Sequence, residues 1–67
     1  MGSVARVSEI SATSDISFED AIKTGVERAQ QTLRNVKSAW IKEQEVQVGD
    51  GGITSYKVNM LISFVLE

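Results

Sequence analysis

The chain has 67 residues, a formal net charge of −2, and neither cysteine nor histidine. This length allows a single domain over residues 1–67, and the lack of these two residue types excludes disulfides and metal sites built from Cys or His. The seven basic residues are scattered and no apolar run is long enough to span a membrane, so we expect a cytoplasmic protein with neither nucleic-acid nor membrane partners. Because so small a core rarely supplies more than about 3–5 kcal/mol, we expect self-association to reinforce the fold.

The first elements in chain order are a strand and an amphipathic helix. Residues 4–12 favour a strand by composition, but apolar and polar residues alternate poorly there, so the two faces of the strand stay unassigned. A cluster of turn-forming residues follows over residues 12–15. The helix is predicted over residues 17–36, with Ser17 as its N-cap and the acidic group of Asp20 reaching back toward that cap. Apolar residues at steps of three and four predict one buried stripe, formed by Phe18, Ala21, Ile22, Gly25, Val26, Ala29, Leu33 and Val36.

Asn35 is the expected stop signal of the helix, and the pattern after it changes to a period of two. The apolar residues of this second strand lie at odd positions before Glu43 and at even positions after it. The switch indicates either a β-bulge near Glu43 or a strand whose far half leaves its own helix and packs on something else. Residues 49–52, Gly-Asp-Gly-Gly, predict a hairpin turn, and residues 53–66 alternate as the last strand.

Pairing Val48 with Ile53 across this turn sets the register of the hairpin. Cross-strand neighbours share a face, so Ala39 and Ile41 lie beside Ile62 and Met60 and form the surface on which the helix packs. The resulting fold is α+β, with β-α-β-β order and a three-stranded antiparallel sheet wrapped on one helix. This sheet face accounts for the apolar stripe of the helix, so we expect function on the opposite face. That face is predicted to collect Ser38, Trp40, Lys42, Gln44, Lys57, Asn59, Leu61 and Ser63.

The candidate functional residues form no catalytic set. Without Cys or His, a Ser nucleophile would need Lys or a carboxylate as its base, and no spacing motif supports such a pair, so we expect no enzyme. Trp40 is either an anchor at an interface between copies or a stacking platform for a planar ligand. Lys57, on the same face, would neutralise a phosphate or meet a carbonyl, or is a plain surface lysine. Glu43 and Glu45 share a strand face and offer oxygen ligands to a hard cation such as calcium, or form a solvated face. Residues 49–52 lack the Lys of a phosphate loop and fit a plain turn.

Several local strings, spread over nearly the whole chain, carry a family resemblance when they are taken together. They are Ala12-Thr13-Ser14, Ser17-Phe18-Glu19-Asp20-Ala21-Ile22, Glu27-Arg28-Ala29, Thr32-Leu33-Arg34-Asn35-Val36, Tyr56-Lys57-Val58 and Ser63-Phe64-Val65-Leu66-Glu67. In this register the chain resembles the dodecins. The resemblance implies a β-α-β-β fold and a non-catalytic, hollow homododecamer that binds flavin, as riboflavin, FMN or FAD, or a related aromatic ligand, and stores or sequesters it.

The resemblance also implies where a flavin would bind. Flavin-binding dodecins stack the ring on a Trp early in the second strand and hydrogen-bond its edge with a Gln early in the third. An ungapped register places these positions at Ser38 and Lys57, and both depart from the flavin-binding pattern. Trp40 lies two residues on, on the same face and about 7 Å away. Trp40 either supplies a displaced stacking platform for the flavin ring or simply fills the space at this site. A further position that lines the flavin site falls on Gln47.

Other dodecin-like proteins lack the flavin residues and are associated with calcium. This sequence is similar to them around Ala39 and Glu43-Gln44. The resemblance therefore leaves a second expectation open, namely a flavin-free assembly that binds a cation such as calcium or is mainly structural. In that case Glu43 and Glu45 are the expected metal ligands.

Overall fold

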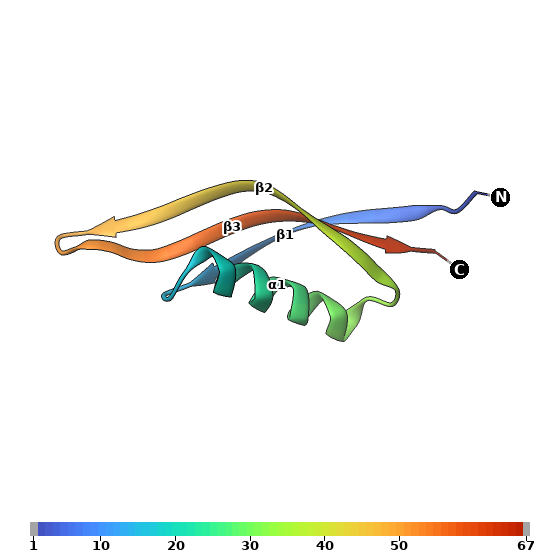
Figure 1. The fold of residues 1–67 in the computed structure, drawn as a ribbon, viewed down its shortest axis with the longest axis horizontal. Coiled ribbons are helices and arrows are strands. Elements are labelled where there is room, and N and C mark those ends of the chain that lie inside the picture. The colour runs from blue at the N-terminus through green and yellow to red at the C-terminus, as the bar shows by residue number, and fades with distance from the viewer. Residues whose placement is uncertain (1, 67) are drawn as a thin grey trace.

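The computed structural model describes residues 2–66 as a three-stranded sheet with one helix across it. The elements in chain order are β1 (Ala5–Ser14), α1 (Phe18–Thr32), β2 (Val36–Gly49) and β3 (Gly52–Val65). The strands lie in the order β1-β3-β2, both pairs are antiparallel, and α1 covers one face (Figure 1). The predicted β-α-β-β fold is confirmed. Within the described residues, α1 is too short and too polar to cross a membrane.

The start of α1 shows how β1 and the helix are joined. Ser17 caps the helix as predicted, because its hydroxyl oxygen accepts a hydrogen bond of 3.0 Å from the backbone N–H of Asp20. The carboxylate of Asp20, however, accepts a 2.6 Å hydrogen bond from the hydroxyl of Ser14, so the prediction that it returns to the cap is wrong. Ser14 is buried at 7% exposure and also accepts from the N–H of Ile16 at 2.9 Å. The strand therefore runs through Thr13 and Ser14, which the sequence placed in a turn.

The helix ends four residues earlier than predicted, at Thr32. Leu33 is already extended, with φ −111° and ψ 139°, and Val36 begins β2. Asn35 is the non-glycine residue with a left-handed backbone, φ 61°, a conformation that Asn tolerates better than most residues. Its carbonyl accepts a 3.1 Å hydrogen bond from the N–H of Val65, which ties the connection to β3.

The core forms where α1 meets the inner face of the sheet, the face on the helix side. The backbones approach closely at Gly25, where a Cβ atom would lie 2.8 Å from Met60 Cε and 3.1 Å from Ala12 Cβ. Small residues on the helix therefore allow the large ones of β3 to be buried completely. The predicted stripe is confirmed, since each of its residues is buried or packs against this cluster. The buried apolar residues are Ala12, Ala21, Ala29, Val58, Met60 and Ile62.

A β-bulge in β2 explains the change of apolar side in the sequence. Ile41 lies opposite Met60, but the next pair is Glu43 with Asn59, so Lys42 is the additional residue. The first of the two alternatives, a bulge near Glu43, is thus confirmed. Beyond it, Gln44 lies opposite the buried Val58, and its predicted place on the outer face is wrong, because one inserted residue turns every later side chain to the other face.

The hairpin of β2 and β3 extends beyond the helix. The pairing of β1 with β3 ends at Ser14 and Tyr56, so the rest of the hairpin is a two-stranded arm that projects past α1 (Figure 1). The predicted pairing of Val48 with Ile53 near its turn is confirmed. We call residues 47–55, which lie beyond the pair of Ser14 and Tyr56, the arm.

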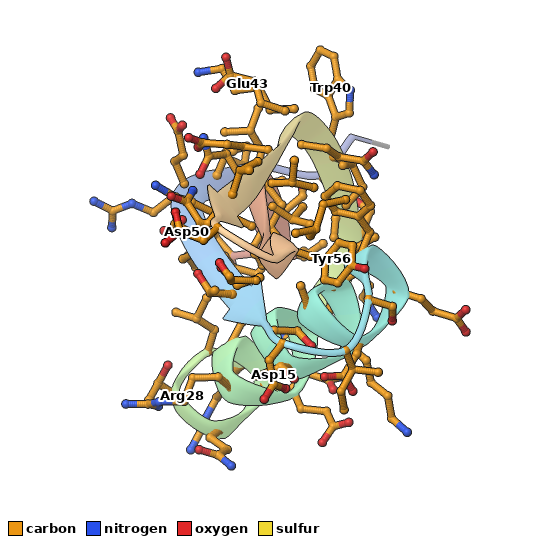
Figure 2. The ribbon with its side chains drawn as sticks, turned by 90° about the vertical axis from the view of Figure 1, so that its left-hand side faces the viewer. Asp15, Arg28, Trp40, Glu43, Asp50 and Tyr56 are labelled. Carbon is orange, nitrogen blue, oxygen red and sulfur yellow. The ribbon has the colours of Figure 1, made fainter. Side chains whose placement is uncertain are left out.

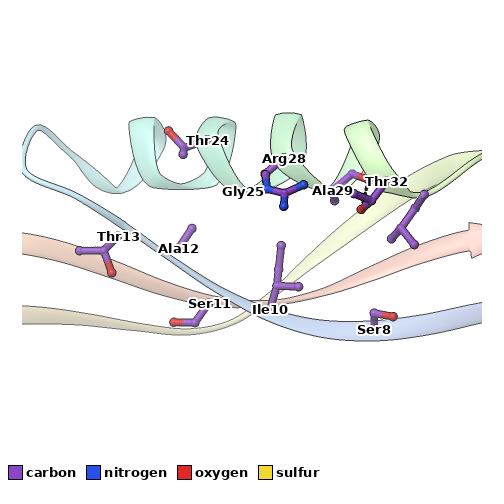
Figure 3. A pocket seen from close by; sticks show the side chains of 11 residues that line it. Ser8, Ile10, Ser11, Ala12, Thr13, Thr24, Gly25, Arg28, Ala29 and Thr32 are labelled. Carbon is purple, nitrogen blue, oxygen red and sulfur yellow. Dashed lines mark hydrogen bonds between the residues drawn. The ribbon is translucent and has the colours of Figure 1, made fainter.

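The helix does not cover the sheet evenly. It packs mainly over β1 and β3 and least over β2. A groove of about 610 Å³ remains between α1 and β1 (Figure 3), which corrects the expectation that the sheet covers the helix stripe completely. Its floor and rim are formed by Ser8, Ile10, Ser11, Ala12, Thr13, Thr24, Gly25, Arg28, Ala29, Thr32 and Leu33.

Candidate functional site

The sheet face that α1 leaves uncovered, the outer face, carries every candidate site residue. Successive side chains of a strand point to opposite faces of the sheet, and cross-strand partners share a face. Met60 and Ile62 are buried against the helix, so their partners on β2 also face the helix and the alternate residues form the outer face. Because of the bulge, Glu43, Glu45 and Gln47 share the outer face with Trp40, although the sequence alternation placed them on opposite faces. The outer face of the hairpin comprises Ser38, Trp40, Glu43, Glu45, Gln47, Ser55, Lys57, Asn59, Leu61 and Ser63.

Trp40 is the most prominent group on this face. Its side chain points away from the helix (Figure 2), and the residue is 70% exposed. It lies opposite Leu61, which is half-buried, and Ser38 is the next outer position along β2. An exposed indole beside an aliphatic side chain can stack against a planar ring and shield it from water. The exposure of Trp40 is compatible with both interpretations from the sequence, an anchor at an interface between copies and a stacking platform for a planar ligand.

Lys57 forms an ion pair on the same face. Its ammonium nitrogen lies 3.9 Å from the Oε1 atom of Glu45, and the two side chains are 39% and 56% exposed. Exposed pairs of this kind contribute little, typically below about 1 kcal/mol, so either group can exchange its partner for a ligand at small cost. Lys57 lies four residues from Leu61 on β3, which corresponds to about 13 Å along the strand. Trp40 and Lys57 of one chain thus share a face without converging on one point.

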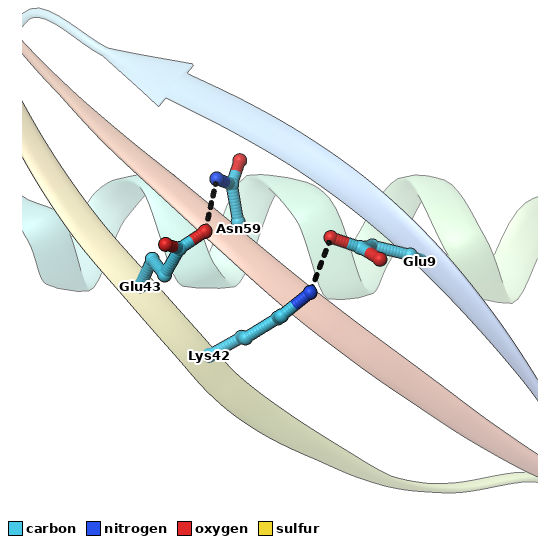
Figure 4. A network of polar contacts seen from close by, with 4 residues as sticks. All are labelled: Glu9, Lys42, Glu43 and Asn59. Atoms are coloured by element: carbon cyan, nitrogen blue, oxygen red, sulfur yellow. Dashed lines mark hydrogen bonds and ion pairs between the residues drawn. The ribbon is translucent and has the colours of Figure 1, made fainter.

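The acidic residues of β2 already have neighbours. Glu43 Oε1 accepts a hydrogen bond of 3.1 Å from the side-chain amide of Asn59, and Lys42 Nζ reaches across β3 to Glu9 Oε2 at 3.4 Å (Figure 4). Asn59 and Glu9 were not candidates from the sequence, because only the register and the bulge reveal what they face. Glu43 and Glu45 do share a strand face, as predicted.

A cation at these carboxylates would need further oxygen atoms. Residues 2–66 contain no group of three or more Asp and Glu side chains arranged to hold a metal ion. Calcium takes 6–8 oxygen ligands, so Glu43 and Glu45 would form only part of its coordination shell. Gln47, opposite Ser55, lies two outer positions from Glu43 and is the nearest further amide on the outer face of that strand, because Gln44 faces the helix side.

Comparison with known proteins places this geometry in a family. The family model described as Dodecin matches residues 4–67. The chain is 34% identical to the dodecin of Thermus thermophilus over 67 residues, which cover all of this chain and 97% of that protein. It is 32% identical to the calcium dodecin of Mycobacterium tuberculosis over 65 residues, 97% of this chain and 92% of that protein.

Solved structures agree with the sequence matches. The dodecin of Streptomyces davaonensis superimposes with a TM-score of 0.93 at 34% identity, covering 100% of this chain and 98% of that chain. The crystal structure of the Mycobacterium tuberculosis protein, described as having a novel calcium-binding site, gives a TM-score of 0.84 at 31% identity, with 97% and 93% of the two chains covered. The chain belongs to the dodecin family.

Proposed function

We propose that this chain forms a hollow homododecamer that binds flavin, as riboflavin, FMN or FAD, or a related aromatic ligand, and stores or sequesters it without catalysing a reaction. The observation that carries the proposal is Trp40, a large aromatic side chain 70% exposed on a sheet face in a family of this fold. Leaving so much aromatic surface in water is unfavourable, and a stacked ring would cover it.

A second copy completes the site in this proposal. Trp40 and Lys57 of one chain are about 13 Å apart along the sheet, so a ring stacked on Trp40 meets a polar group of another protomer more readily than Lys57 of its own. Lys57 of that second copy would then donate a hydrogen bond to a carbonyl or phosphate oxygen of the ligand. Ser38, the neighbouring outer position, leaves room beside the indole because its side chain is small.

The test is the quenching of flavin fluorescence by the purified protein. Riboflavin, FMN and FAD are each titrated with wild type, Trp40→Phe and Trp40→Ala, and with Glu27→Ala, an exposed helix residue off this face, as the matched control. We expect quenching by wild type and by Glu27→Ala, reduced quenching by Trp40→Phe, and none by Trp40→Ala. Absence of quenching by micromolar wild-type protein would contradict flavin binding.

One further variant decides whether Ser38 and Lys57, which depart from the flavin-binding pattern, prevent flavin binding. Ser38→Trp with Lys57→Gln places at these positions the residue types that the resemblance associates with flavin. If only this double variant quenches, the scaffold is competent for flavin and residues 38 and 57 have removed the function. Light scattering of the wild type tests the assembly separately, and a monomer mass would contradict it.

The second candidate function is a flavin-free assembly that binds calcium. It is favoured by the two carboxylates of Glu43 and Glu45 on the outer face and by the similarity to a relative named calcium dodecin. Calcium is titrated by calorimetry into wild type and Glu43→Gln, with Asp50→Asn in the hairpin turn as the control. We expect Glu43→Gln alone to lose the heat of binding, and no heat with wild type would exclude this candidate.

A further inference from the structure

The outer face carries a row of three residues that crosses all three strands. Leu61 of β3 lies opposite Trp40 of β2 on one side and opposite Glu9 of β1 on the other. Neighbouring strands are about 4.8 Å apart, so the backbones of Trp40 and Glu9 are about 10 Å apart with Leu61 between them. Trp40 stands up from this face (Figure 2), whereas Leu61 is half-buried, so the indole forms a wall beside an aliphatic floor.

An ion pair lies along the same row. Lys42 is the additional residue of the bulge, and its side chain crosses β3 until Nζ lies 3.4 Å from Glu9 Oε2 (Figure 4). The two side chains are 48% and 51% exposed. An ion pair so open to water contributes little to stability, so both groups can exchange each other for a ligand at small cost. The row therefore combines an aromatic wall and an apolar floor with a donor and an acceptor side by side.

A ring that stacks on Trp40 stands over Leu61 with one edge toward the sheet. In a flavin, the pyrimidine edge of the ring presents an N–H donor between two carbonyl acceptors. We propose that the Glu9–Lys42 pair recognises this edge: the Glu9 carboxylate accepts a hydrogen bond from the ring N–H, and the Lys42 ammonium donates one to a neighbouring carbonyl. The inference rests on the flavin binding proposed above and names two residues that would orient the ring on Trp40 of the same chain.

The other charged groups of the outer face are less suited to the ring N–H. Lys57 offers only donors, and Glu45 is its partner at 3.9 Å, farther along the hairpin. Glu43 lies in the next row, where its Oε1 atom already accepts a hydrogen bond from the amide of Asn59 at 3.1 Å. Glu9 is therefore the carboxylate that shares a row with the indole.

Riboflavin and N3-methylriboflavin test this contact, because they differ by one methyl group on the edge nitrogen. Both are titrated against the purified protein by fluorescence quenching. We expect the wild type to bind riboflavin at least about tenfold more tightly, since the methyl group removes the donor and leaves the carboxylate without it. In Glu9→Leu, the affinity for riboflavin should fall at least about tenfold, and the ratio of the two dissociation constants should approach one.

Three further variants separate the roles of the neighbouring groups. Lys42→Met should weaken both ligands by a similar factor, because both retain the ring carbonyls. Glu43→Leu decides between the two carboxylates near the indole, since it would remove the preference for riboflavin only if Glu43 accepted from the ring. Lys23→Met, at an exposed position on the helix, is the matched control and should leave both dissociation constants unchanged. Glu9 and Lys42 are exposed, so the circular dichroism of their variants should be that of the wild type.

The outcomes distinguish this inference from the proposed function on which it rests. The inference is overturned if the wild type binds the two ligands equally, if Glu9→Leu keeps the wild-type ratio, if Lys42→Met binds both as tightly as the wild type, or if Glu43→Leu removes the ratio instead. In each of these cases the wild type still quenches flavin, so the proposed function stands. Absence of quenching with both ligands would contradict the proposed function, and this inference with it.

Discussion

The hydroxyl of Ser14 joins the end of β1 to the start of α1, and its removal should be costly for so small a chain. In Ser14→Ala, the carboxylate of Asp20 loses a donor at 2.6 Å and the N–H of Ile16 loses an acceptor at 2.9 Å. A hydrogen bond to a charged group contributes about 1.5–3 kcal/mol and a neutral one about 1 kcal/mol. Because water can reach Ile16 and part of Asp20, we expect the free energy of unfolding to fall by about 2–3 kcal/mol rather than by the full sum.

Urea unfolding followed by far-ultraviolet circular dichroism measures this change at one fixed protein concentration, because assembly contributes to the apparent stability. Ser17→Ala is the matched control, since it removes only the N-cap and should cost about 1 kcal/mol. A double-mutant cycle of Ser14→Ala with Asp20→Ala isolates the pair, and we expect a coupling energy above about 1 kcal/mol. The reasoning fails if the coupling is below about 0.5 kcal/mol or if Ser14→Ala costs no more than Ser17→Ala.

Other substitutions test the core, the connection to β2 and the outer face. Met60→Ala should lower the free energy of unfolding by about 2–5 kcal/mol, because Met60 is completely buried, whereas Met60→Leu should cost less than about 1.5 kcal/mol; equal losses would contradict this. Asn35→Ala should be about 1 kcal/mol less stable than Asn35→Gly in the same urea assay, since both lose the side chain and only Ala is penalised at φ 61°. Lys42→Met should change stability by less than about 1 kcal/mol, because its partner Glu9 is exposed; a larger loss would indicate that this pair is more than a surface contact.

The sequence predicts the elements whose causes are local. The stripe of α1 follows from residue spacing, the cap at Ser17 from one side chain and its own backbone, and the hairpin turn from its glycines. The bulge is also visible, because the apolar side of β2 changes near Glu43. Each of these features depends on residues close together in the chain, so a pattern within a short window is sufficient to predict it.

The features that depend on distant residues could not be predicted. The partner of Asp20 is Ser14 rather than the cap, because the end of β1 brings a buried hydroxyl to the helix start. The helix ends at Thr32 although the apolar spacing continues, since the connection through Asn35 must reach β3. The alternation located the bulge, but only the register shows that it moves Glu43 to the face of Trp40.

The same bulge decides how the two proposed functions relate to each other. By placing one additional residue at position 42, it brings Glu45 opposite Lys57 on the outer face, where the two side chains neutralise each other at 3.9 Å. A cation held by Glu45 would have to displace the ammonium group of Lys57, and a ligand that takes Lys57 would release Glu45 as an unpaired anion. Flavin and calcium would therefore not bind independently, because both act on one weak ion pair.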